Sequence, residues 1–161
     1  MSEKLDIERS TADAFLGAYN ARTGKQFTII EHSDSPDFRC RDNNTGELLD
    51  LEITLLEDVR GDAQYRLARG SKQGVRCFNQ DTLSLFNERL LDKCLKDYGT
   101  HAALVLRQVA PLWTTSDWEM YRDDFEAVIP PECRKTFTKG IWVLTWKDSF
   151  ELKERDIVQL Q

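Results

Sequence analysis

Residues 35–56 read SPDFRCRDNNTGELLDLEITLL, an apolar stretch that is interrupted by acidic residues. The turn-forming run NNTG at 43–46 separates two segments, 37–42 and 47–56, that have the composition of β-strands. We expect them to pair as an antiparallel hairpin.

Side chains alternate between the two faces of a β-strand. In the second strand this places four apolar residues on the core side: Leu49, Leu51, Ile53 and Leu55. The opposite side then carries Asp50, Glu52, Thr54 and Leu56.

The hairpin can bring Asp37, at the start of the first strand, close to Glu52 in the second. Two neighbouring carboxylates repel each other and need a proton or a cation between them. Hard oxygen ligands of this kind suit Mg²⁺ or Mn²⁺. The alternative interpretation is an edge strand with a solvated acidic face, in which Asp37 only forms a turn after Pro36.

The remaining elements suggest a mixed α/β architecture. Helices are predicted at 6–24, 81–99 and 114–129, and strands at 25–32, 101–109 and 140–146. The order is α-β-β-β-α-β followed by α-β, which favours a mixed β-sheet flanked by helices. Residues 57–80 are rich in charge and glycine and show no regular pattern.

The composition is that of an ordinary globular protein, with 161 residues, 40% apolar and 31% charged. We expect one domain over residues 1–161. No apolar stretch is long enough to span a membrane and the N-terminus is polar, so we expect a cytoplasmic protein. The net charge of −6 argues against a protein that coats nucleic acid by charge alone.

The four cysteines are scattered and form no C-x-x-C pair, so zinc-ligand spacing is absent. We expect reduced thiols and no disulfide framework at this size and composition.

The pattern PDF, then a hairpin, then LDLEIT resembles the PD-(D/E)xK nuclease superfamily, which has a restriction-endonuclease-like core. The α-β-β-β-α-β order over residues 6–108 is similar to that core. The resemblance implies a metal-dependent nuclease that hydrolyses phosphodiester bonds of nucleic acid, with DNA favoured and Mg²⁺ or Mn²⁺ as cofactor. It implies that Asp37 and Glu52 bind the metal and that the Ile53 carbonyl is a further ligand.

One position departs from the family pattern, because Thr54 stands where the motif lysine belongs. Some members supply that lysine from another element. Lys93, in the helix after the hairpin, is the first candidate and Lys72 the second; each could instead be a solvated lysine. Glu8 matches an acid that some members use as an extra metal or water ligand, or it is an ordinary first-turn glutamate.

A basic segment at 59–76 follows the acidic strand and contains one acid, Asp62. Arginine recognises phosphate well and a tyrosine can stack on a base, so the segment is either a nucleic-acid-binding element or a solvated loop. Its candidate binding residues are Arg60, Tyr65, Arg66, Arg69, Lys72 and Arg76.

Two functions remain open. The first is an active nuclease, which the Asp37 and Glu52 pair and the basic segment favour. The second is a catalytically inactive nuclease-like domain that acts as a binding or regulatory protein, which Thr54 and the negative net charge favour. Many members of the superfamily form homodimers, but no feature of the sequence identifies an interface.

Overall fold

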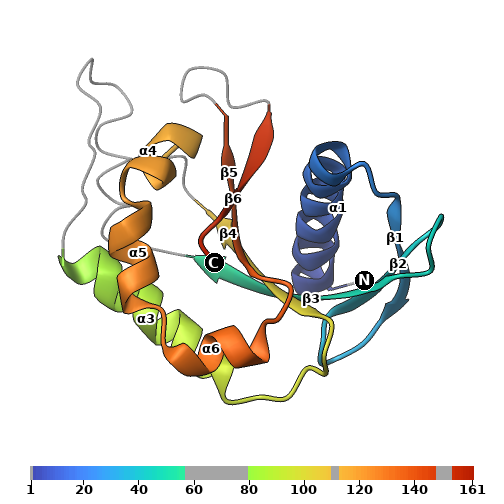
Figure 1. The fold of residues 1–161 in the computed structure, drawn as a ribbon, viewed down its shortest axis with the longest axis horizontal. Helices are drawn as coiled ribbons and strands as arrows, with labels where there is room; N and C mark the ends of the chain where they lie inside the picture. Colours follow the sequence, from blue (N-terminus) through green and yellow to red (C-terminus); the bar gives the residue numbers. More distant parts are fainter. Residues whose placement is uncertain (1, 57–79, 110–112, 148–153) are drawn as a thin grey trace.

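The computed structural model describes residues 2–56, 80–109, 113–147 and 154–161 (Figure 1). In these ranges the chain forms a six-stranded mixed β-sheet and five helices, which confirms the α/β class. The strands lie in chain order across the sheet. They are β1 (Phe27–His32), β2 (Phe38–Asp42), β3 (Leu48–Leu56), β4 (Ala102–Gln108), β5 (Ile141–Trp146) and β6 (Arg155–Gln159).

The centre of the sheet is parallel and its margins are antiparallel. Strands β3, β4 and β5 run parallel to one another, while β1 and β2 at one side and β6 at the other pair antiparallel with their neighbours. Because parallel neighbours need a crossover, β3 is joined to β4, and β4 to β5, through helical segments.

Helices cover both faces of the sheet, as Figure 1 shows. On one face lies α1 (Glu3–Thr23), which contacts β1, β3, β5 and β6 and ends at Gly24 in a left-handed conformation. The other face is covered by the described helices of the two crossover segments. They comprise α3 (Gln80–Cys94), α4 (Thr115–Met120), α5 (Arg122–Val128) and α6 (Pro131–Thr136).

The sheet therefore separates two apolar cores. Leu49, Leu51 and Ile53 of β3 belong to the core beneath α1, as the alternation of the strand predicted. Leu104 and Leu106 of β4 belong to the core beneath α3, α5 and α6.

The C-terminal third differs from the sequence prediction. The helix expected at 114–129 is two helices, α4 and α5, that meet at Tyr121. Thr114 is the N-cap of α4, and its backbone N–H donates a hydrogen bond to the Asp117 carboxylate. Helix α6, which begins at a proline, and the antiparallel strand β6 were not expected. Short elements such as these carry too few residues to show a clear period.

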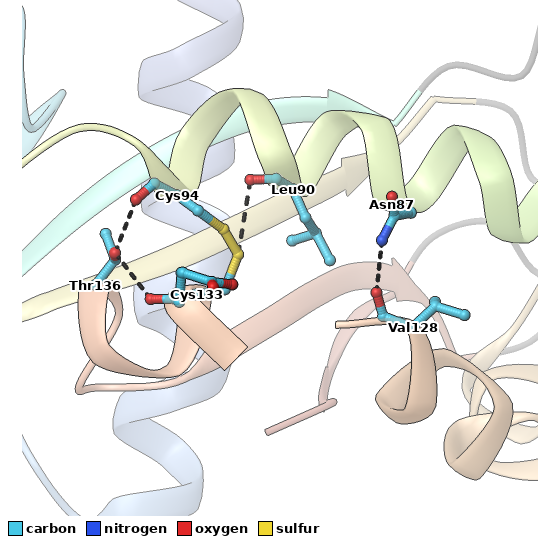
Figure 2. The surroundings of a disulfide bond; sticks show 7 residues. Asn87, Leu90, Cys94, Val128, Cys133 and Thr136 are labelled. Atoms are coloured by element: carbon cyan, nitrogen blue, oxygen red, sulfur yellow. Dashed lines mark hydrogen bonds between the residues drawn. A yellow bond between two sulfur atoms is a disulfide. The ribbon is translucent and has the colours of Figure 1, made fainter. Parts of the chain in front are cut away.

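The expectation of reduced cysteines is wrong for one pair. Cys94, at the end of α3, forms a disulfide with Cys133 of α6, 39 residues away, with their Cα atoms 4.8 Å apart (Figure 2). Beside this bond the Thr136 hydroxyl donates a hydrogen bond to the Cys94 carbonyl at 3.0 Å.

Cys40 is a buried free thiol, and burial, followed by the charge of Asp50, raises its pKa to about 12.

Reducing the disulfide should lower the stability of the chain. A cross-link between residues this far apart restricts the unfolded chain and is worth about 2–4 kcal/mol. We expect the free energy of unfolding in urea to fall by that amount for a Cys94→Ala, Cys133→Ala double variant, and for the wild type in reductant. An equal free energy of unfolding with and without reductant would show that the bond is not formed in solution.

None of the described helices is both long enough and apolar enough to cross a membrane.

Candidate functional site

The hairpin register places Asp37 opposite Glu52. Phe38 of β2 pairs with Leu51 of β3 in an antiparallel ladder, so the residue before Phe38 meets the residue after Leu51. The Asp37 carboxylate accepts a hydrogen bond of 2.7 Å from the Ile53 backbone N–H. The bond fixes Asp37 against β3 at the position that the hairpin prediction required.

The acidic face of β3 is not a solvated edge. Strand β3 lies inside the sheet, between β2 and β4, and Asp50 and Glu52 are each only 3% exposed. Asp50 has its own partner, because Arg39 on the neighbouring strand donates to it at 3.1 Å. Arg39 belongs to the hairpin and balances the charge of Asp50, so the charge of Glu52 needs a cation from another part of the chain.

Lys93 supplies that cation from the last turn of α3. Its ammonium group lies 2.7 Å from Glu52 Oε1, and its side chain is 22% exposed. The packing of α3 on β3 thus brings a lysine to the acidic pair although position 54 carries a threonine. Of the two lysines considered from sequence, Lys93 reaches the site, and Lys72 lies outside the described residues.

An open cleft of about 490 Å³ borders this group, whose acids are buried and whose lysine is partly exposed. It runs between the N-terminal half of α1, the end of β3 and the end of α3. Its lining includes the predicted site residues Glu8, Asp37, Glu52, Ile53 and Lys93, together with Thr54 of β3. It also includes residues that the sequence did not single out, among them Lys4, Asp34 and Lys96.

The environment of Asp37 disfavours its ionised form. Burial raises its pKa to about 6, and the negative charges of Glu52 and Glu8 add to the effect, while the Ile53 N–H and the Lys93 charge oppose it. The ordinary value is 3.8. The Lys93 charge therefore does not offset the combined effect of burial and the neighbouring acids on the Asp37 pKa.

This shift predicts a pH-dependent stability. Between pH 4 and pH 6 the folded chain keeps the Asp37 proton that the unfolded chain has lost, so stability falls as pH rises through this window and then levels off. The loss attributable to Asp37 is at most about 3 kcal/mol. Asp37→Asn retains an oxygen that can accept from the Ile53 N–H, and it should remove this part of the pH dependence. Urea unfolding of the wild type and of Asp37→Asn at pH 4 and pH 7 measures this difference. The same pH dependence of stability in both proteins would contradict a raised pKa of Asp37.

The second oxygen of Glu52 is buried and, among the described residues, has no hydrogen-bond partner. A buried carboxylate oxygen without a donor is unfavourable, so the site is suited to an additional cation. The described part of the chain holds no group of three or more His, Cys, Asp or Glu side chains arranged to bind a metal. Mg²⁺ is commonly held by one or two carboxylates, and water molecules complete its coordination shell. Asp37 and Glu52 can provide these carboxylates.

Tyr98, which sequence analysis missed, is the other polar group in this region. It follows α3, is 3% exposed, and its hydroxyl group also has no hydrogen-bond partner among the described residues. Burial raises its pKa above the ordinary value of 10.0, and the charges of Glu52 and Asp37 raise it further. In sequence, Tyr98 is one aromatic residue beside a helix-ending glycine, a pattern that does not suggest proximity to an acid.

The predicted nucleic-acid-binding residues of the basic segment, from Arg60 to Arg76, lie outside the described residues. Their assignment stays a prediction.

Comparison of the chain with protein-family models, with curated proteins and with solved structures finds no match.

Proposed function

We propose that the protein is a metal-dependent nuclease of the PD-(D/E)xK type, which hydrolyses phosphodiester bonds of nucleic acid, with DNA as the favoured substrate. The observation that carries this proposal is the ion pair of 2.7 Å between Lys93 and Glu52, in a cleft that also contains Asp37. Two acids and a lysine are the groups that the motif requires, and here the lysine comes from α3.

The buried setting supports catalytic use of these groups. Charged side chains held in a preorganised, weakly solvated site stabilise developing charge better than mobile surface groups do. Lys93 is suited to stabilising the negative charge that builds up on the phosphoryl oxygens during attack by water. Thr54 carries no charge and cannot take this role.

Asp37 and Glu52 would hold a divalent cation, with the Ile53 carbonyl as a further candidate ligand. Both acids lie at one end of the hairpin, the Glu52 Oε2 atom lacks a donor among the described residues, and burial, followed by the charges of Glu52 and Glu8, raises the pKa of Asp37. When bound, Mg²⁺ or Mn²⁺ would polarise a phosphoryl oxygen and lower the pKa of a water molecule. Glu8, which lines the cleft with an ion pair of 3.5 Å to Lys4, is suited to orienting a water molecule.

Access to the site is consistent with a chain-like anionic substrate. The cleft is open, and Lys4 and Lys96 are exposed residues in its lining. The exposed acids Glu3 and Asp34 also line the cleft, so its entrance carries charges of both signs, while Asp37 and Glu52 lie deeper. A divalent cation held by Asp37 and Glu52 would add the positive charge that a backbone phosphate needs to approach the site against the net charge of −6.

The decisive assay is cleavage of single-stranded and duplex DNA and RNA by the full chain with Mn²⁺, with Mg²⁺ and with EDTA. We expect cleavage of at least one substrate with the divalent ions and none with EDTA. Glu52→Gln serves as the inactive control. Binding of nucleic acid without cleavage in any metal would favour the alternative, a nuclease-like domain that acts as a binding or regulatory protein.

A further inference from the structure

Tyr98 lies on the same face of the sheet as Glu52. Glu52 pairs in register with Leu104 of β4, and Leu104 belongs to the core that includes Tyr98. The Tyr98 ring is fixed by stacking on Phe137, with ring centroids 5.3 Å apart. Its hydroxyl group is therefore held at the α3 side of the acidic strand.

Two buried polar atoms in this region have no hydrogen-bond partner among the residues that the structure describes. Tyr98 Oη and Glu52 Oε2 are both inaccessible to solvent, and neither makes a hydrogen bond of normal length and angle with a described residue. Burial and then the Glu52 charge raise the Tyr98 pKa, as expected for a hydroxyl group near this acid. The two groups are therefore neighbours that make no hydrogen bond of normal geometry in this arrangement.

We propose that Tyr98 is a positioning residue of the site, whose hydroxyl group donates a hydrogen bond to Glu52 Oε2 while Lys93 donates to Oε1. This inference rests on the proposed function, because it assigns Glu52 the role of a metal ligand. A side-chain rotation that joins the two atoms would satisfy a buried donor and a buried acceptor at once, and Tyr98 Oη is a donor of suitable type.

The consequence for the site is a carboxylate fixed at both oxygens. A carboxylate offers about four lone-pair sites, so one donor on each oxygen leaves two for a cation. Hydrogen-bond partners of metal ligands hold them in orientation, and their loss typically weakens metal binding by about 10- to 100-fold. Tyr98 would act on the metal through Glu52 and would not touch it.

The first test measures the Tyr98 and Glu52 pair without metal. Thermal unfolding in EDTA is compared for the wild type, Tyr98→Phe, Glu52→Met and the double variant. Tyr98→Phe keeps the ring that stacks on Phe137, and Glu52→Met keeps the side-chain length but removes the acceptor. We expect Tyr98→Phe to lower the Tm of the wild type by roughly 3–10 °C and to have less than half that effect in the Glu52→Met background. Equal shifts in the two backgrounds would overturn the proposal.

The second test measures Mn²⁺ affinity by calorimetry for the wild type and Tyr98→Phe. Tyr19→Phe, which deletes a tyrosine hydroxyl on α1 on the opposite face of the sheet, is the matched control. We expect Tyr98→Phe to bind Mn²⁺ about 10-fold more weakly or worse, and Tyr19→Phe to bind it normally. Unchanged affinity in Tyr98→Phe would overturn the positioning role. If the wild type binds no Mn²⁺, the proposed function fails. The thermal unfolding of the four proteins in EDTA would still decide whether Tyr98 is hydrogen-bonded to Glu52.

Discussion

Replacing Glu52 with glutamine is expected to reduce Mn²⁺-dependent cleavage by at least about 10³-fold. Glu52 is 3% exposed and paired with Lys93, and the glutamine side chain keeps its shape while losing its charge. A metal ion contributes several kcal/mol to stabilising the transition state, and each 1.36 kcal/mol is a factor of ten in rate. The measurement is the rate of cleavage at saturating Mn²⁺, together with Mn²⁺ affinity by calorimetry, which should fall in parallel.

Glu47→Gln is the matched control for this substitution. Glu47 immediately precedes β3 and forms partly exposed ion pairs with Lys25 and Lys139. Its loss removes the same charge from the chain without touching the cleft, so cleavage should change little. Comparable losses in the two variants would mean that net charge, and not the position of Glu52, controls activity.

Replacing Lys93 with methionine is expected to reduce cleavage by about 10²- to 10³-fold, the usual effect of removing one preorganised charge-stabilising group. Methionine keeps the aliphatic stem that crosses from α3 to β3 and deletes only the ammonium group. Since Lys93 competes with any cation for the Glu52 carboxylate, Mn²⁺ affinity should not decrease. This combination of lost cleavage and retained metal binding separates Lys93 from Glu52.

Lys96→Met is the control, because Lys96 is an exposed residue that also lines the cleft. We expect a modest change with weaker substrate binding. Full cleavage by Lys93→Met would show that another group supplies the positive charge, and Lys72 of the basic segment would then be the residue to test.

The centre of the site could be predicted because it depends on local rules. Alternation along β3 separates Leu51 from Glu52, and the NNTG turn sets the register that places Asp37 opposite Glu52. The choice of Lys93 depended on the family resemblance, since helical spacing alone does not distinguish it from other charged positions on α3.

The missed features depend on contacts between distant segments. Cys94 and Cys133 meet only because α6 packs on α3, and no spacing rule indicates a pair 39 residues apart. Tyr98 is buried because Phe137, from another crossover, stacks on it. The helix predicted at 81–99 also ends early, at Cys94, and Leu95 in the segment beyond it is 84% exposed.

Anomalous diffraction from crystals soaked in Mn²⁺ would locate the proposed metal ion. We expect a manganese peak bounded by the carboxylates of Asp37 and Glu52, present in the wild type and absent in Glu52→Gln. A wild-type crystal that shows no manganese between these two residues at millimolar Mn²⁺, with the cleft open to solvent, would contradict the proposed metal site.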